Sequence, residues 1–576
     1  MTYAEILSNN QLLKDQLIGT EKYPIIVLSN IIVSQQKEIL EHSLRKHKIN
    51  AEVSFGDYDN IVQDSTYLLT GQQAVIIFWE AANFIEGFSY KASIMSEEQI
   101  IEVQKKIQSE ILAVFNQLKN VPVVLFNTFS ALPFSSESLQ KNKLEIICDE
   151  LNYFIETNAP TNVISVNIDK LYSRVSLSNA IDWRYWYSSK SLYTIDFFKE
   201  YTEFVLPVFL SLAGKSKKAL FVDCDNTLWK GIIGEDGMGG ILMSSSVKGG
   251  AVFEEIQANI VELARKGVIV GLASKNNAED VDEVINNHPD ILLKNENIVI
   301  KAVNWLDKPD NIRWMVKELN IGTDSCVFLD DSDFEVGYVK ENVPELSVYQ
   351  VPQKTYLYPS LVRNIKSLFY NWSVSAEDAK RVEMYKAEKQ RTIEQSTFIS
   401  IDEYLDSLEL KLILYNNDAT YISRLAQMTQ KTNQFNLTTK RYTETEINKH
   451  MQNGDSVIAF ELKDKFGDYG ITGMCIITYA GNEAVIDTFL MSCRVIGRNV
   501  EKAFFDEIIK LINKKGNITF LRANYLRTMK NEQVSQFYDK LGLSLDKTTP
   551  SGNSYYLIPQ EYLFNNIKYI QIEYGK

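Results

Sequence analysis

The chain has 576 residues, of which 45% are hydrophobic and 11% aromatic, a composition ample for the packed cores of about three or four domains. Its formal net charge of −14 argues against a nucleic-acid-binding protein, which would normally present a basic face. The five cysteines form no Cys-x-x-Cys pair and are odd in number, so neither a zinc site nor a disulfide framework is predicted. With no signal-peptide pattern and no apolar stretch long enough to span a bilayer, we expect a cytoplasmic protein without a membrane partner.

Residues 1–200 are expected to form a separate α/β domain. Buried strands separated by helical stretches are predicted at 25–28, 74–78 and 121–126. The region resembles an SGNH-hydrolase domain, but its first strand leads into Ser29-Asn30-Ile31 where such hydrolases carry Gly-Asp-Ser. We therefore expect a non-catalytic domain that serves docking or assembly. An esterase that uses Ser29 is the alternative.

The most informative stretch is the apolar run 219–222, which leads into Asp223-Cys224-Asp225. The run predicts a buried parallel strand that delivers both acids to the carboxyl edge of a sheet, where α/β proteins bind ligands. Asp223 could attack phosphorus, Asp225 could pass a proton to the leaving oxygen, and the pair could share a divalent cation. A chance acidic turn is the alternative reading of this motif alone.

Three groups further along the chain would complete such a site. Ser274 follows the strand-like run 268–273, and its hydroxyl could donate to phosphate oxygens. Lys308 could balance the charge of the phosphate. Asp330 and Asp331 follow another apolar strand, and Asp331 could hold the metal ion.

The block 216–370 resembles a haloacid-dehalogenase-type (HAD) domain, whose fold is a Rossmannoid parallel sheet. The helix predicted at about 251–266 begins only about two dozen residues after Asp225, so we expect no large cap over the site. The resemblance implies Mg²⁺ as cofactor, and hard carboxylate oxygens fit that ion better than zinc. The implied catalytic residues are Asp223, Asp225, Ser274 and Lys308, and the implied metal ligands are Asp223, Asp225, Asp330 and Asp331.

The stretch 228–237, Leu-Trp-Lys-Gly-Ile-Ile-Gly-Glu-Asp-Gly, resembles more specifically the FkbH-like family of polyketide pathways. This resemblance implies that a glyceryl unit derived from 1,3-bisphosphoglycerate is loaded onto an acyl carrier protein. The chain departs from the family pattern at Lys230, where Gly is usual, and at 332–333, where Asn-Pro is usual. The resemblance continues in the stretches 424–436, 465–470 and 487–501.

Residues 371–400 are predicted to form a charged helical connector. Arg381, Tyr385, Glu388 and Arg391 follow one another at spacings of three and four residues, which places them on one helix face. A semi-rigid connector of this kind would fix the distance between the domains on either side.

Residues 401–576 show an α+β pattern, with strands predicted at 456–461, 471–478 and 484–491. The last strand is followed by a glycine-containing turn and a helix that begins near Val500. Backbone N–H groups and the helix dipole at such a turn suit the phosphate of a pantetheine arm. The arrangement resembles the GNAT acyltransferase fold, with Gly usual at the position of Asn499. The predicted cofactor-binding residues are Arg494, Gly497, Arg498 and Asn499.

Cys493 is the predicted acyl-accepting nucleophile. It stands beside Arg494 and near Arg498, an electropositive setting that favours the thiolate. A buried structural cysteine is the alternative. Cys224 is the rival nucleophile, but alternation along its strand predicts that its side chain points into the core.

These sites together predict a glyceryl transferase and phosphatase. The substrate would be 1,3-bisphosphoglycerate or a similar phosphorylated three-carbon acid, and the acceptor would be the phosphopantetheine thiol of an acyl carrier protein. Lys431, Lys440 and Arg441 are the candidate docking patch for an acidic carrier. Two alternatives stay open: a stand-alone magnesium-dependent HAD phosphatase with a pantetheine-binding domain, and a non-catalytic carrier-protein assembly factor.

Overall fold

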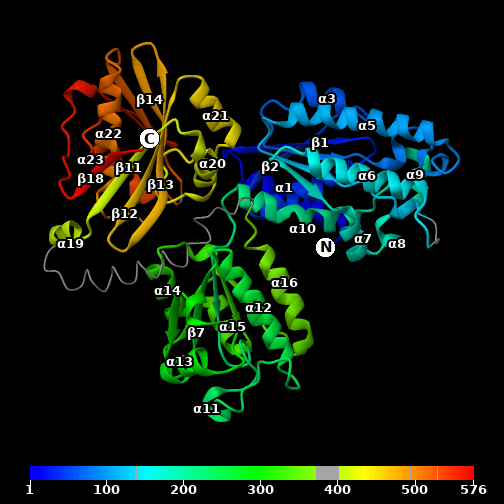
Figure 1. The fold of residues 1–576 in the computed structure, drawn as a ribbon, viewed down its shortest axis with the longest axis horizontal. Coiled ribbons are helices and arrows are strands. Elements are labelled where there is room, and N and C mark those ends of the chain that lie inside the picture. Colours follow the sequence, from blue (N-terminus) through cyan, green and yellow to red (C-terminus); the bar gives the residue numbers. More distant parts are fainter. Residues whose placement is uncertain (136–138, 372–400, 493–494, 529, 576) are drawn as a thin grey trace. The chain divides into compact units, whose positions relative to one another are not determined.

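The computed structural model describes residues 1–135, 139–371, 401–492, 495–528 and 530–575. The chain divides into two compact units, Met1–Ala213 and Gly214–Lys576. Three β-sheets form their frameworks, one in the first unit and two in the second (Figure 1). Within the described ranges, no helix is both long and apolar enough to cross a membrane. Cys493, Arg494 and, apart from residue 371, the predicted connector lie outside the described residues.

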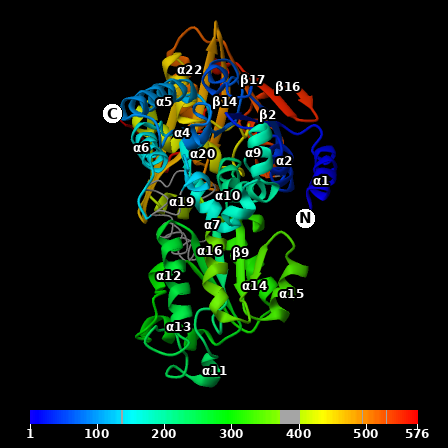
Figure 2. The same ribbon diagram turned by 90° about the vertical axis from the view of Figure 1, so that its right-hand side faces the viewer.

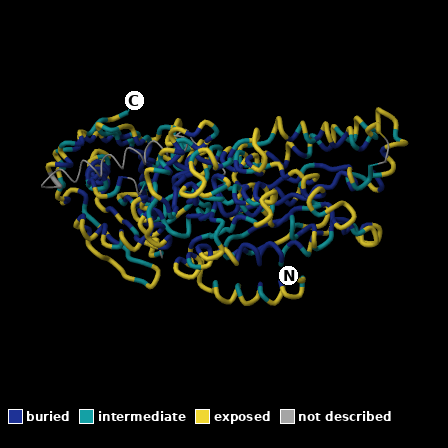
Figure 3. The backbone as a smooth tube through the Cα atoms, turned by 90° about the horizontal axis from the view of Figure 1, so that it is seen from below, coloured by how far each residue is buried: buried dark blue, intermediate teal, exposed yellow. Residues whose placement is uncertain are grey.

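The first unit contains a five-stranded parallel sheet built from β1 (Lys22–Ser29), β2 (Asn50–Phe55), β3 (Ala74–Phe78), β4 (Val123–Asn127) and β5 (Val163–Val166). The strand order is β2-β1-β3-β4-β5. The three predicted strands, β1, β3 and β4, form the buried centre of the sheet and are confirmed. Figure 3 draws buried stretches of the backbone in dark blue. The edge strands β2 and β5 are partly exposed and lack a continuous apolar run, so the sequence pattern missed them.

Helices cover both faces of this first sheet. Alternate residues of the central strands, such as Ile26 and Leu28, pack in one core with residues of α3, α5 and α6. On the other face, the ring of Phe78 contacts Phe198 and Tyr201 of α10. The helices are α1 (Tyr3–Gln16), α2 (Gln36–Lys46), α3 (Ile61–Tyr67), α4 (Phe88–Lys91), α5 (Glu97–Leu118), α6 (Lys143–Asn158), α7 (Ile168–Val175), α8 (Leu177–Ala180), α9 (Trp183–Ser189) and α10 (Ile195–Leu212).

The second sheet is also five-stranded and parallel, with β6 (Ala219–Val222), β7 (Ile269–Ser274), β8 (Ile300–Val303), β9 (Cys326–Asp330) and β10 (Ser347–Gln350) in the order β10-β9-β6-β7-β8. Residues alternate between its two faces, so Leu220 and Val222 pack with one group of helices and Ala219 and Phe221 with the other. Figure 2 shows the two helical layers on opposite sides of the sheet. The first layer is α12 (Ala251–Arg265), α13 (Ala278–Asn287) and α16 (Tyr358–Ser367), and the second is α14 (Lys308–Glu318) and α15 (Asp333–Asn342).

The segment between β6 and α12 contains one short helix, α11 (Ile233–Asp236), and no inserted domain. The prediction of a parallel-sheet domain without a large cap is therefore confirmed.

The third sheet has eight strands in the order β16-β17-β15-β14-β13-β12-β11-β18, and its α+β character and three predicted strands are confirmed. The pairs β11–β18 and β14–β15 are parallel. Residues of α22 pack on one face and those of α20 and α21 on the other. The strands are β11 (Leu410–Asn416), β12 (Ser456–Asp464), β13 (Gly467–Ala480), β14 (Glu483–Met491), β15 (Phe520–Leu526), β16 (Ser544–Thr549), β17 (Gly552–Leu557) and β18 (Ile570–Tyr574). The helices are α19 (Ile401–Ser407), α20 (Ile422–Lys431), α21 (Glu444–Gln452), α22 (Val500–Lys514) and α23 (Phe537–Lys540).

Candidate phosphoryl-transfer site

The predicted phosphoryl-transfer residues come together at the carboxyl edge of the second sheet. Asp223 directly follows β6, Ser274 ends β7 and Asp330 ends β9, and these three strands are neighbours in the sheet. Lys308 begins α14, after β8, because Pro309 fits only the first turn of a helix. Four segments that are distant in the sequence therefore supply one site.

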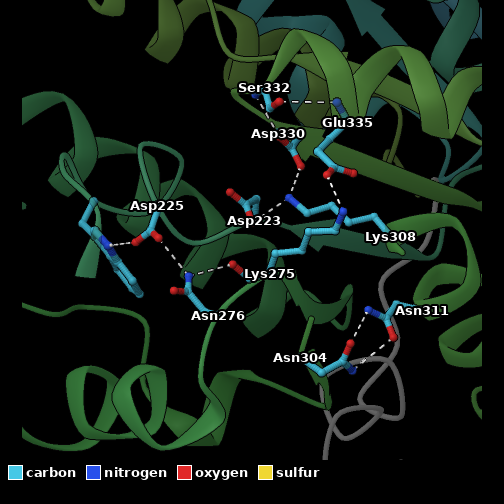
Figure 4. A network of polar contacts seen from close by, with 12 residues as sticks. Asp223, Asp225, Lys275, Asn276, Asn304, Lys308, Asn311, Asp330, Ser332 and Glu335 are labelled. Atoms are coloured by element: carbon cyan, nitrogen blue, oxygen red, sulfur yellow. Dashed lines mark hydrogen bonds and ion pairs between the residues drawn. The ribbon is translucent and has the colours of Figure 1, made fainter. Parts of the chain in front are cut away.

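Lys308 lies between two carboxylates at the centre of this site (Figure 4). Its Nζ is 2.9 Å from Oδ1 of Asp223 and 2.5 Å from Oδ2 of Asp330, and all three side chains are buried. Burial alone would lower the pKa of Lys308, but the two carboxylates outweigh it and raise that pKa. The lysine therefore stays charged, as its predicted charge-balancing role requires.

The site carries more negative than positive charge. Ligand oxygens of Asp223, Asp330 and Asp331 all lie within 4.8 Å of one another. Burial raises the pKa of Asp223 despite the opposing charge of Lys308, and burial together with the charge of Asp223 raises the pKa of Asp331 to about 6. Three carboxylates around a single ammonium group fit a divalent cation with hard-oxygen preference, such as Mg²⁺.

Asp225, which the sequence also assigned to the metal, is not one of these three carboxylates. Its Oδ1 accepts hydrogen bonds from Trp229 Nε1 at 2.9 Å and from the backbone N–H of Ile233 at 3.0 Å. Its Oδ2 accepts one from Asn276 Nδ2 at 2.9 Å (Figure 4). These contacts suit the predicted proton-transfer role, because they hold the carboxylate in a defined orientation.

A second lysine joins the loops around the site. Lys275 Nζ is 2.9 Å from Glu335 and 3.5 Å from Asp307, so it links the loop after β7 to α15 and to the residue before α14. Neither Lys275 nor Asn276 was predicted as a site residue, although both directly follow Ser274. Their position next to a predicted phosphate donor was the available signal.

Cys224, the rival nucleophile, is fully buried in the core beneath the site. Burial and the charge of Asp223 raise the pKa of its thiol well above the ordinary value, which leaves it protonated and unreactive. The prediction that its side chain points into the core is confirmed. Of the cysteines in the described ranges, Cys148, Cys326 and Cys475 are buried as well.

The predicted phosphate-binding turn of the third sheet precedes α22. Asn499 is the N-cap of α22 and adopts a left-handed backbone with φ of 58°, a conformation that glycine adopts freely and that asparagine tolerates better than most residues. Its Nδ2 donates to Tyr569 Oη at 2.6 Å, and Gly497 has a φ of 87°. Arg498 is only 5% exposed, and its guanidinium lies 5.0 Å from the ring centre of Tyr469.

The parallel pair β14–β15 separates beyond its first few residues. It pairs Glu483–Ile486 with residues 520–523, and further on Leu437 bridges the two strands. The N–H of Leu437 donates to Phe489 O at 3.1 Å, and its carbonyl accepts from the N–H of Leu526 at 2.8 Å. An extended ligand, such as the predicted pantetheine arm, that paired with β14 at this point would therefore have to displace Leu437.

The basic residues proposed for carrier docking are partly engaged within their own domain. Lys440 forms an ion pair with Asp487, and Arg441 donates to the carbonyl of Thr432 and to the side chain of Asn433. A carrier that docked there would compete with these contacts.

The first sheet also gathers polar groups at its carboxyl edge. Both ends of the Asn30 amide bind the backbone of Glu80: Nδ2 donates to Glu80 O at 3.0 Å, and Oδ1 accepts from Glu80 N at 2.7 Å. Tyr193 donates to the buried Glu80 carboxyl group. Burial raises the pKa of Glu80 to about 7, so this acid is largely neutral under conditions where an exposed glutamate is ionised.

Comparison with known proteins identifies a shared fold for about two thirds of the chain. No protein-family model and no curated protein matches the chain. A solved structure, the N-terminal part of protein BF1531 from Bacteroides fragilis, contains a phosphatase domain complexed with Mg; it is 22% identical and has a TM-score of 0.56. The match covers 65% of this chain and 100% of that one. At this identity the likeness shows the fold alone.

Solved acetyltransferases also match part of the chain. The PaiA N-acetyltransferase from Thermoplasma acidophilum, in complex with coenzyme A, is 20% identical over 20% of this chain and 72% of that one, with a TM-score of 0.18. A GNAT-family acetyltransferase from Streptococcus pneumoniae is 12% identical over 26% of this chain and 98% of that one, with a TM-score of 0.21. Such low TM-scores do not assign the fold of the third sheet.

Proposed function

We propose that this protein is a magnesium-dependent phosphatase joined to an acyltransferase. The observation that carries the phosphatase half is the buried Lys308 between Asp223 and Asp330, with Asp331 close by. Asp223, Asp330 and Asp331 would hold Mg²⁺, which when bound neutralises charge on the phosphate. The Mg in the BF1531 structure, which shares this fold, supports the choice of ion.

The side chains divide the phosphatase reaction between them. Asp223 attacks phosphorus, and the bond from phosphorus to the leaving oxygen breaks while Asp225 gives that oxygen a proton. Water then cleaves the aspartyl phosphate, and the proton that it releases returns to Asp225. Ser274 donates to a phosphate oxygen, and Lys308 holds Asp223 in place through their ion pair.

The acyltransferase half rests on the sequence motifs. Cys493 attacks the acyl-phosphate carbonyl of 1,3-bisphosphoglycerate, forms a thioester and releases inorganic phosphate. The phosphatase site removes the remaining phosphate ester, and the glyceryl group passes to the pantetheine thiol of an acyl carrier protein. The glycine-containing turn with the left-handed Asn499 at the start of α22 suits the phosphate of that arm.

Intact-protein mass spectrometry tests this function. The protein and a phosphopantetheinylated carrier are incubated with 1,3-bisphosphoglycerate and Mg²⁺. We expect a glyceryl-sized gain on the carrier, preceded by a hydroxylamine-labile gain on the enzyme. In the Cys493→Ala variant covalent loading should stop, whereas in Asp223→Asn the adduct should retain its phosphate. Loading that survives Cys493→Ala would remove this cysteine from the mechanism.

A stand-alone phosphatase is the second candidate function. It is favoured by the gathering of Asp223, Lys308, Asp330 and Asp331 within a single described domain. Release of phosphate from small esters without any carrier, together with no mass gain on either protein, would select it over the two-step transferase.

A further inference from the structure

Asp225 is held by three neutral N–H donors from two different segments. Trp229 and Ile233, in the segment that follows β6, both donate to Oδ1, whereas Asn276 donates to Oδ2. An ionised carboxylate only accepts hydrogen bonds, so it can satisfy all three donors. Oδ1 accepts two N–H groups and Oδ2 only one, which leaves a lone pair on Oδ2 for a proton.

Asn276 also contacts the predicted phosphate donor. Its Nδ2 lies 3.1 Å from Ser274 Oγ as well as 2.9 Å from Asp225 Oδ2, and the side chain is 6% exposed. Burial raises the pKa of Asp223, and the Ser274 hydroxyl opposes part of that rise. A chain of polar contacts therefore runs from Ser274 through Asn276 to Asp225.

We propose that Asn276 is a positioning residue, which fixes Oδ2 of Asp225 toward the leaving oxygen of a phosphate ester bound at Ser274. The inference rests on the phosphatase function proposed above. As Asp223 attacks, the bond from phosphorus to the leaving oxygen breaks and that oxygen takes the proton from Oδ2. The water that later cleaves the aspartyl phosphate gives a proton back to Oδ2, so the cycle is balanced.

Leaving-group dependence separates this role from a merely structural one. An alkyl phosphate such as 3-phosphoglycerate releases an alkoxide that must be protonated, whereas p-nitrophenyl phosphate releases a phenolate that leaves without a proton. General acid catalysis contributes roughly 10²- to 10⁴-fold, so misplacing the acid should affect mainly the alkyl ester. A general loss of structure would slow both reactions alike.

The experiment compares kcat/KM, which covers the steps up to the departure of the leaving group and not the later hydrolysis of the shared aspartyl phosphate. It is measured for both esters, with Mg²⁺ present, in the full-length wild type, Asn276→Ala and Asn277→Ala. Asn277 is the matched control, because this exposed neighbour binds Trp305 and Asp280 and does not contact Asp225. We expect Asn276→Ala to lower the ratio of kcat/KM for the alkyl ester to kcat/KM for the aryl ester by at least about tenfold. Asn277→Ala should keep the wild-type ratio.

An unchanged ratio in Asn276→Ala, or equal losses on both esters, would overturn the inference while leaving the phosphatase intact. Failure of the wild type to hydrolyse either ester would overturn the proposed function and this inference with it. If Asn276→Ala does not fold, as judged by its thermal unfolding, Asn276→Ser decides the question by the same ratio. Its shorter hydroxyl should still give a several-fold lower ratio.

Discussion

The first and second sheets have the same construction but opposite chemistry at their carboxyl edges. Each is a five-stranded parallel sheet with a buried acid just beyond a central strand, Glu80 in one and Asp223 in the other. Asp223 lies beside a buried lysine and two more carboxylates. Glu80 is hydrogen-bonded by Tyr193, and its backbone is bound by Asn30.

The difference shows that position at a sheet edge does not by itself make a functional site. The edge at Asp223 keeps its charges and has more carboxylates than its lysine can balance, so it can attract a cation and a phosphate. At Glu80 the polar groups satisfy one another and the acid is neutral below about pH 7. Such an edge contributes to the fold and offers little to a charged ligand.

Matched acid-to-amide substitutions at the carboxyl edges of the two sheets should differ most in their effect on phosphatase activity. Asp223→Asn removes the attacking carboxylate and should lower Mg²⁺-dependent hydrolysis of p-nitrophenyl phosphate by at least about 10³-fold. Glu80→Gln should change the rate less than about twofold, because the substitution keeps the size of the side chain and lies in the other compact unit. Comparable losses in both variants, with both still folded, would contradict the contrast.

Loss of Lys308, at the carboxyl edge of the second sheet, should strongly destabilise the folded protein. Lys308→Met leaves Asp223 and Asp330 buried without a cation, which should cost about 3–5 kcal/mol in the free energy of unfolding at pH 8. In the variant the folded-state pKa of both acids would lie above the unfolded value, so their penalty should shrink as the pH falls toward 5. Urea unfolding at both pH values measures the effect.

Lys366 provides the control for this experiment. It pairs with Glu262 near the surface of the same domain, where solvent screens the interaction. Lys366→Met should therefore cost less than about 1 kcal/mol and show little pH dependence. Equal losses in the two variants would mean that the buried position of Lys308 carries no special weight.

Glu80, at the carboxyl edge of the first sheet, should make the stability of the protein depend on pH. The pKa of Glu80 is about 7 in the folded protein against an ordinary value of 4.5, so its stabilising contribution is complete below pH 4.5 and is lost as the pH rises to 7. A shift of this size corresponds to about 3 kcal/mol. Glu80→Gln should flatten that slope and gain stability relative to wild type above pH 7, measured by urea unfolding. The exposed Glu156→Gln, in the same unit, should leave the wild-type slope.

The sequence predicted the central strands and the residues at their ends. Buried parallel strands such as β3 and β6 are continuous apolar runs, and the polar residue that follows each run must lie at the sheet edge. The partly exposed edge strands β5 and β10 have no such run and were not predicted. Burial on both faces is therefore the property that made a strand predictable from the sequence.

Contacts between loops were beyond the sequence pattern. Asn276 reaches Asp225 only because the segments after β6 and β7 fold toward each other, and no spacing rule encodes that approach. Glu80 and Tyr193, 113 residues apart, meet in the same way. The metal assignment of Asp225 followed from the motif alone, whereas the structure directs its carboxylate to Trp229 and Asn276.

The smallest effect is expected at Ser29, the alternative esterase nucleophile. Its hydroxyl donates to the carbonyl of Ile31 at 2.8 Å, so its proton is held by a backbone acceptor that cannot act as a general base. Ser29→Ala should therefore change hydrolysis of p-nitrophenyl acetate by less than about twofold, as should the exposed control Ser34→Ala. A loss of tenfold or more in Ser29→Ala alone would mean that the first edge is catalytic after all, and the contrast between the two sheets would then rest on their substrates.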